Sequence, residues 1–81
     1  MGLKDTVELM LSDNYKDRFK AEYYQVKTRY EKLHKMVIKY TAETLDFEPD
    51  CPLYLLVKQE KIMEEYLHTL EIRAEIEKIE L

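Results

Sequence analysis

The chain has 81 residues, of which 46% are hydrophobic and 37% are charged, and its formal net charge is -4. A chain of this length forms one domain, and so small a domain needs disulfides, metals or partners to complete its stability. Its only cysteine, Cys51, excludes an intramolecular disulfide, and the acidic balance argues against general DNA or RNA binding. No apolar run approaches the roughly 20 residues needed to span a bilayer, so we expect a cytoplasmic protein without a membrane segment.

The composition favours long helices. One glycine and two prolines leave few places for turns, and a high content of Glu, Lys, Leu and Tyr is typical of helices. A short first helix is expected over residues 5–11, where Asp5 and Glu8 have the spacing of a capping box.

Residues 14–42 show the clearest helical pattern in the sequence. The segment begins in a cluster of N-cap residues, Ser12-Asp13-Asn14. Its apolar seam has coiled-coil spacings of three and four residues: Tyr15, Phe19, Tyr23, Val26, Tyr30, Leu33, Val37 and Tyr40. A helix of this length is roughly 40 Å long, so it must pair lengthwise with another helix.

A break over residues 43–51 separates this helix from a last helix over residues 52–79. Pro49 and Pro52 forbid a continuous helix through this point. Pro52 suits the first turn of the last helix, with Asp50 or Cys51 as its cap.

The last helix carries two apolar stripes. One is a seam of Leu53, Leu56, Met63, Leu67, Leu70 and Ala74. The other lies roughly 80–160° around the helix and consists of Leu55, Ile62, Tyr66 and Ile76. A hairpin partner covers only one stripe, and seven N-terminal residues are too few to cover the second. The predicted fold is therefore all-α: a short N-terminal helix, then a long antiparallel helical hairpin, completed as an oligomeric bundle of undetermined chain number.

The charges are distributed unequally along the chain. Residues 14–40 contain eight Lys or Arg and three acids, a net of +5, whereas residues 41–81 contain four and eleven, a net of -7. Either a basic helix simply packs beside an acidic one, or the basic helix also attracts an anionic ligand.

Two Glu-x-x-His pairs, Glu31 with His34 and Glu65 with His68, have the i, i+3 spacing of di-iron four-helix bundles. The two glutamates lie about 130° and about 180° from the apolar seams of their helices, so such ligands would not meet in the core. We interpret both histidines as surface residues and predict no metal site.

Catalytic motifs are not found. The sequence contains no P-loop, dinucleotide fingerprint or zinc spacing. Cys51 stands beside Pro52 at a helix start, but no histidine or glycine-rich turn accompanies it. We therefore predict that the protein is not an enzyme and uses no cofactor.

A basic stripe on the first long helix is the candidate binding site. The predicted ligand-binding residues are Lys16, Lys20, Tyr24, Lys27, Thr28 and Lys39. The first four fall within roughly 80° of one another on the helical wheel, away from the seam. Because tyrosine stacks on planar bases and lysine pairs with phosphate, the stripe suits a small anionic nucleotide, especially between two subunits. The alternative is an ordinary lysine-rich exterior with Tyr24 at an oligomer contact.

The last helix also carries a family resemblance. Its pattern Leu56-x-x-Gln59-x-x-x-Met63-x-x-Tyr66-Leu67-x-x-Leu70-x-x-Arg73-Ala74, after a basic helix, resembles small uncharacterised phage and prophage proteins of a crAss-phage-related family. The resemblance spans roughly residues 15–76. It implies phage origin, a helical hairpin and, for early phage proteins of this size, a counter-defence role in the cytoplasm of an infected bacterial cell.

A looser resemblance is to phage hairpin proteins that act as sponges for the cyclic nucleotides of anti-phage systems such as CBASS and Thoeris. Those proteins are non-enzymatic helical oligomers that bind ligand with a tyrosine and a lysine fifteen residues later. Tyr24 and Lys39 have this separation. Fifteen helical residues span about 22 Å, so the two side chains meet one ligand only across subunits.

Two functions follow as hypotheses. The first is a phage counter-defence protein that acts by stoichiometric binding, more specifically a sponge for a nucleotide immune signal held between subunits. The second is an inhibitor or adaptor that binds a host defence protein through the acidic last helix, which contains Glu60, Glu64, Glu65, Glu71 and Glu75. The sequence identifies neither the ligand nor the host target.

Overall fold

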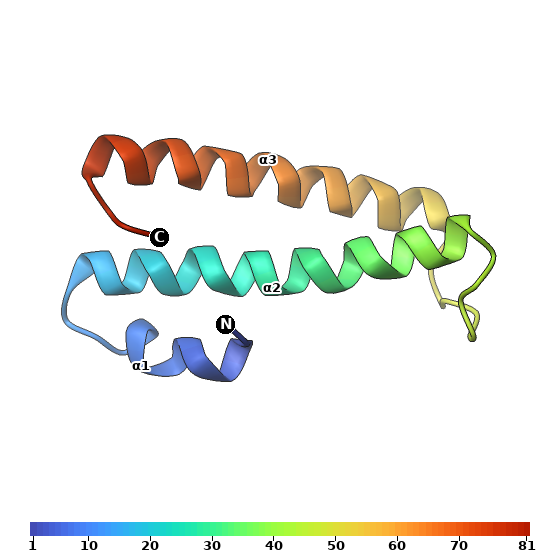
Figure 1. Ribbon diagram of the computed structural model, residues 1–81, viewed down its shortest axis with the longest axis horizontal. Helices are drawn as coiled ribbons and strands as arrows, with labels where there is room; N and C mark the ends of the chain where they lie inside the picture. The colour runs from blue at the N-terminus through green and yellow to red at the C-terminus, as the bar shows by residue number, and fades with distance from the viewer.

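The computed structural model describes residues 1–81 as an all-helical hairpin with an additional N-terminal segment (Figure 1). The elements in chain order are the 3₁₀ helix η1 (Leu3–Thr6), α1 (Val7–Met10), α2 (Tyr15–Thr41) and α3 (Leu53–Glu77). The long helices α2 and α3 lie antiparallel and side by side along their whole length. The all-α prediction and the predicted helical hairpin are confirmed. No helix has the length and apolar character that a bilayer crossing requires.

Helix α2 begins and ends where its sequence favours these boundaries. The side-chain oxygen of Asn14, the N-cap residue, accepts a 2.9 Å hydrogen bond from the Lys16 backbone N–H. The helix ends at Thr41, and Glu43 then adopts a left-handed conformation with φ of 61°. Its neighbour Thr44 donates a backbone hydrogen bond of 2.8 Å to the Lys39 carbonyl, which closes the helix end.

Helix α3 begins without a side-chain cap. Pro52 is its N-cap residue, and the Pro52 carbonyl accepts hydrogen bonds from the backbone of Leu55 and Leu56. The expectation that Asp50 or Cys51 caps this helix is therefore wrong. Pro52 occupies the cap position itself because its fixed φ and extended ψ deliver the chain directly into the first turn.

The core lies between α2 and α3. Its fully packed members are Phe19, Tyr23, Leu67, Leu70, Ala74 and Ile79. Only 9 of 81 residues are buried, so a single chain has little interior. The arginine at position 73 adds a cation–π contact, with its Cζ 5.0 Å from the ring centroid of Phe19.

The N-terminal segment packs on the side of α2 that faces away from α3 (Figure 1). The fully buried Thr6 anchors it, because the Thr6 hydroxyl donates to the Leu3 carbonyl and accepts a 3.0 Å hydrogen bond from the Gln25 amide. The predicted capping box of Asp5 and Glu8 is not formed. The Asp5 carboxylate instead accepts a hydrogen bond from the Gly2 backbone, because the helical segment begins two residues earlier than expected.

The chain folds back after α3. Lys78 adopts a left-handed conformation with φ of 57°, and the Ile79 N–H donates to the Ala74 carbonyl at 2.8 Å. This reversal turns Ile79 into the core, and the last residues lie along the hairpin beside α2 (Figure 1).

The molecule is a slab one helix thick. Its extents are 43 × 24 × 16 Å, and the N-terminal segment, α2 and α3 lie in one layer (Figure 1). A layer of helices has two broad faces, and each is within reach of solvent.

Candidate ligand-binding site

A row of hydrogen bonds between tyrosines or histidine and carboxylates joins α2 to α3. The members are Tyr15 with Glu77 at 2.9 Å, Tyr23 with Glu71 at 2.7 Å, Tyr30 with Glu64 at 2.6 Å, and His34 with Glu60 at 3.1 Å. A fifth bond, in which Tyr66 of α3 donates to Glu22 of α2, runs in the reverse direction and lies on the opposite side of the hairpin from the Tyr23 and Tyr30 pairs. Each hydroxyl donates to an ionised acceptor, which makes these bonds stronger than neutral ones.

The tyrosines in this row hold their protons unusually tightly. Burial, together with the hydrogen bond to Glu71, raises the pKa of Tyr23 to about 12. The hydrogen bond to Glu64 and partial burial raise the pKa of Tyr30 to about 12. Both hydroxyls therefore remain neutral donors up to pH values at which an ordinary tyrosine, with a pKa of 10.0, ionises.

A groove lies between α2 and α3 at the level of this row. Its main cavity has a volume of about 260 Å³. The lining residues are Tyr23, Lys27, Tyr30, Glu31, Glu64, Leu67, His68 and Glu71. The Lys27 ammonium lies 5.8 Å from the centroid of the Tyr23 ring, so it stands over an aromatic surface at the cavity edge. We call the broad face that contains this cavity the groove face.

A smaller cavity of about 90 Å³ adjoins the groove and shares Lys27 and Glu31 with it. Its other lining residues are Met1, Tyr24 and Thr28. The Thr28 hydroxyl lies 2.8 Å from the Met1 carbonyl oxygen and fixes the N-terminal residue at the cavity rim. The Tyr24 ring packs edge-to-face against Tyr23, with the centroids 5.2 Å apart.

The structure thus brings together three of the predicted binding residues, Tyr24, Lys27 and Thr28, around one cavity. Lys16 lies outside it, and its ammonium is 3.4 Å from the Lys78 carbonyl oxygen. Lys39 is exposed near the end of α2, about 22 Å along the helix from Tyr24.

Lys20 is half-buried on α2 and lines neither cavity. It lies seven residues before Lys27, so about 10 Å of helix separates the two. On the helical wheel Lys20 and Lys27 point in nearly the same direction, so both lie on the groove face of α2.

Sequence reasoning missed several residues of the groove. The periodicity of the sequence assigns Tyr23 and Tyr30 to the apolar seam and predicts that His68 is a surface histidine. The two tyrosines do pack in the hairpin, but their hydroxyl ends reach the groove. The spacing of these residues does contain a signal. From Tyr23 to Tyr30 to His34 the steps along α2 are seven and four residues, and from Glu71 to Glu64 to Glu60 the steps back along α3 are also seven and four. Such matched steps are the register of an antiparallel helix pair.

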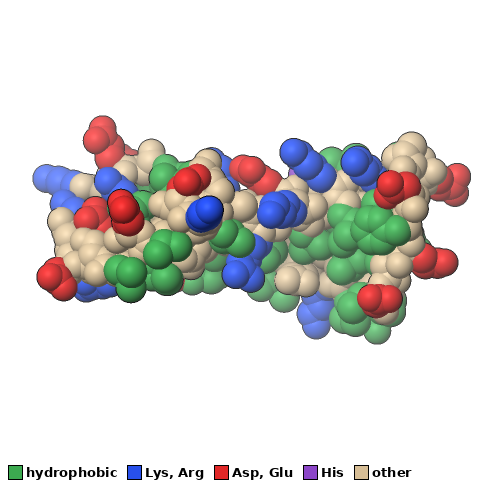
Figure 2. All heavy atoms as spheres, turned by 90° about the horizontal axis from the view of Figure 1, so that it is seen from below, with side chains coloured by type: hydrophobic (Ala, Val, Ile, Leu, Met, Phe, Trp, Pro, Cys, Tyr) green, Lys and Arg blue, Asp and Glu red, His purple; other side chains and the backbone are tan.

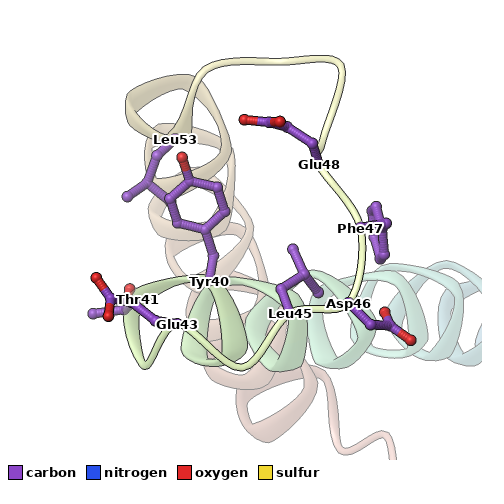
Figure 3. Close-up of a pocket in the computed structure, with 8 residues that line it drawn as sticks. All are labelled: Tyr40, Thr41, Glu43, Leu45, Asp46, Phe47, Glu48 and Leu53. Atoms are coloured by element: carbon purple, nitrogen blue, oxygen red, sulfur yellow. The ribbon is translucent and has the colours of Figure 1, made fainter.

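The largest hollow in the molecule lies elsewhere, at the loop between α2 and α3 (Figure 3). It has a volume of about 720 Å³ and is widely open. Tyr40 rises from the last turn of α2 and Leu45 from the loop that follows it, and Glu48 points across the hollow from the opposite side (Figure 3). Glu43, Asp46 and Glu48 all line it, so its charge disfavours an anionic ligand.

Metal-ligating side chains are dispersed. No three histidine, cysteine or carboxylate side chains are arranged to hold a metal ion. His34 pairs with Glu60 across the hairpin, and Cys51 is exposed without a disulfide partner.

The fold and groove define the class of protein: a small helical hairpin with a cleft between its two long helices. Its family follows from comparison with family models, because the Sequestin model matches residues 13–76. The chain belongs to the Sequestin family, and the matched range covers α2, the connecting loop and all of α3 except its last residue. The family name denotes sequestration, which is binding without chemical conversion, and it fits a sponge-type protein. Searches of the curated proteins and of the solved structures find no match.

Proposed function

We propose that this chain is a phage counter-defence protein that sequesters a small anionic nucleotide, the signal of a bacterial immune system, by stoichiometric binding. The observation that carries the proposal is the pair of adjoining cavities that share Lys27 on the groove face. Membership of the Sequestin family supports a binding role. The protein would act in the cytoplasm of the infected cell.

The groove offers both chemical features that a nucleotide requires. The Lys27 ammonium supplies a positive charge for a phosphate, and half-buried Lys20 adds a second cation about 10 Å along the helix. The rings of Tyr23, Tyr24 and Tyr30 supply aromatic surface on which a base stacks.

The carboxylates of the groove restrict how such a ligand lies. Glu64 and Glu71 already accept tyrosine hydrogen bonds, and their charge repels a phosphate from the α3 side. On α2 the carboxylate of Glu31 lines both cavities together with Lys27, so the phosphate belongs at the Lys27 ammonium itself, and the base lies towards the tyrosines. Lys39 meets the same ligand only if a second chain supplies it.

Isothermal titration calorimetry against cyclic dinucleotides, cyclic trinucleotides and cyclic ADP-ribose derivatives tests this proposal. We expect one member of the panel to bind with a Kd below about 10 μM, or roughly 7 kcal/mol, and to be recovered unaltered afterwards. Lys27→Ala should weaken that binding at least about tenfold, which is roughly 1.4 kcal/mol. The matched control is Lys32→Ala, because Lys32 is an exposed lysine on the same helix that lines no cavity. If no ligand in the panel binds below about 10 μM, the sponge proposal fails.

The acidic loop hollow favours a second candidate, an inhibitor that binds a basic host protein. Phe47 is 56% exposed there, among Glu43, Asp46 and Glu48. An exposed aromatic ring within a ring of carboxylates suits an arginine- or lysine-rich partner. A pull-down from host lysate at low and high salt tests it. A specific partner that is lost at high salt and with Phe47→Ala, in the absence of any nucleotide ligand, would favour this candidate.

A further inference from the structure

One broad face of the slab is apolar and has no cover within the chain. We call it the apolar face. Its exposed members are Leu55, Ile62 and Tyr66 of α3, and the half-buried Val26 and Leu33 border it on α2, where Val26 also packs against the core. On α3 the exposed fraction is 41% for Leu55, 54% for Ile62 and 41% for Tyr66. Figure 2 shows the slab edge-on from the side of the N-terminal segment, and hydrophobic side chains occur along its lower edge, which is the far side of the slab in Figure 1.

The α3 residues of this face have the spacing of a helix-packing seam. Leu55 and Ile62 are seven residues apart, and Tyr66 follows four residues later. This is the heptad pattern by which one helix packs lengthwise on another. The first seam of α3 is already used against α2, where Leu67, Leu70 and Ala74 are buried.

No other part of the chain covers the apolar face. The N-terminal segment contacts α2 and does not contact α3. The C-terminal residues Ile79 and Leu81 lie beside Tyr23 and Glu71, which places them on the groove face. The occupant of the apolar face therefore comes from outside the chain.

We infer that a second copy of this chain packs on the apolar face, so that two slabs form a two-layer, four-helix bundle. The broad side of the whole slab, including the N-terminal segment, measures 43 × 24 Å, or about 1,000 Å² in projection. The part formed by α2 and α3 is smaller and is comparable with the roughly 800 Å² that each partner buries in a stable interface. Stable domains are generally built from at least two packed layers, and one chain supplies a single layer. A second copy supplies the other layer with a seam of the same length and composition.

Charge selects one of the two ways to pair the slabs. Helix α2 carries eight Lys or Arg and three acids, a net of +5, whereas α3 carries three and six, a net of -3. A two-fold axis across the helices would place α2 on α2, with like charges together. A two-fold axis parallel to the helices places α2 of each copy on α3 of the other, so opposite charges adjoin. The second arrangement brings both interhelical loops to the same end of the bundle.

This arrangement has a consequence for the groove. Because the apolar faces meet in the middle, the two groove faces point outwards on opposite sides. Each chain then holds its own ligand, and Lys39 of the partner does not reach it. The inference about association is independent of the proposed ligand.

Sedimentation equilibrium of the full chain and two variants tests the association. The wild-type chain should have twice the 9.9 kDa monomer mass, and Ile62→Glu should raise the dimer dissociation constant at least about tenfold by burying an unpaired charge. The matched control is Ile72→Glu, because Ile72 is similarly exposed on α3 but lies about 80° around the helix from Ile62. It should remain a dimer. Leu55→Glu is a second interface variant, and circular dichroism verifies that each variant is helical. A monomeric wild-type chain, or equal dissociation constants for Ile62→Glu and Ile72→Glu, would overturn the inference.

The native cysteine tests the arrangement. Cys51 is exposed in the loop, and it is the only cysteine, so a nitroxide label there gives one distance between the two copies. Loops at the same end predict a distance well below the 43 Å length of the slab. A distance near that length would place the loops at opposite ends and exclude the proposed pairing. Ligand calorimetry on Ile62→Glu separates the two proposals, because its groove should still bind one ligand per chain.

Discussion

The Tyr23 hydroxyl donates a 2.7 Å hydrogen bond to Oε2 of Glu71, which lies 48 residues later in the chain. Tyr23 also belongs to the buried core and lines the groove, so one side chain joins the packing of the hairpin to its candidate site. The bond fixes the register of α2 against α3. A substitution that removes only the hydroxyl measures the contribution of this bond to stability while the aromatic ring stays in the core.

Tyr23→Phe should lower the free energy of unfolding by about 1–2 kcal/mol. The substitution removes only the hydroxyl, so the aromatic packing is kept while the charged acceptor loses its donor. Urea denaturation followed by circular dichroism measures the change. Tyr54→Phe is the control, because Tyr54 is exposed and makes no side-chain hydrogen bond, and it should change stability by less than about 0.5 kcal/mol. Equal effects of the two substitutions would contradict the role of the Tyr23 bond.

Stability should depend on pH in the alkaline range. Tyr23 and Tyr30 have folded pKa values of about 12, above the ordinary value of 10.0. The folded state therefore binds these protons more tightly than the unfolded state. The resulting stability is fully present below pH 10 and is lost as the pH rises from 10 to about 12.

Urea midpoints measured between pH 8 and about pH 12 check this dependence. In the double variant Tyr23→Phe, Tyr30→Phe the decline between pH 10 and about 12 should be smaller, because only Tyr15 and Tyr66, whose pKa values are also raised by hydrogen bonds to Glu77 and Glu22, remain to contribute. A decline of the same size in the double variant would show that other groups cause it.

Leu70→Ala should be among the most damaging single substitutions. Leu70 is only 1% exposed at the centre of the core, and such truncations cost about 2–5 kcal/mol. Because the slab has so little interior, few neighbouring side chains can shift to fill the space. Thermal unfolding of Leu70→Ala beside Ile72→Ala provides the comparison, since Ile72 is exposed on the same helix. Similar losses at the two positions would argue against the described core.

Lys78→Gly should stabilise the protein by up to about 1 kcal/mol. Lys78 adopts the left-handed conformation that ends α3, and this conformation strains any residue with a Cβ. The Lys61→Gly variant places the same change inside the helix and should instead destabilise by about 1 kcal/mol. Chemical denaturation of both variants would show opposite signs, and a destabilised Lys78→Gly would refute this reading of the helix end.

The sequence contains enough information to predict the helical hairpin but not the exact ends of its helices. The seam from Tyr15 to Tyr40 repeats over many turns, so α2 and its lengthwise pairing are strongly determined. The ends depend on single local choices. The N-terminal segment begins as a 3₁₀ helix that uses Asp5 inside its first turn, and propensity alone does not distinguish this from a cap at Asp5.

The candidate site was only partly predictable. A helical wheel places Lys27 near Tyr24, since both lie on one helix. It does not reveal His68 or Glu64 as neighbours of Lys27, because that contact depends on the register between two helices. The N-terminal residue at the rim of the small cavity depends on the buried Thr6 anchor, which no periodic pattern indicates.

The thinness of the slab bears on how such a protein can evolve. In a thick domain, a substitution near a ligand is transmitted through a shared interior to distant surfaces. Here a side chain on either broad face of α3 has solvent or a partner beyond it, and only a narrow line of core residues lies between the two faces. Changes at Lys27 and changes at Ile62 should therefore be nearly additive in their energies. Substitutions on the groove face can therefore change ligand preference during evolution without disrupting association through the apolar face.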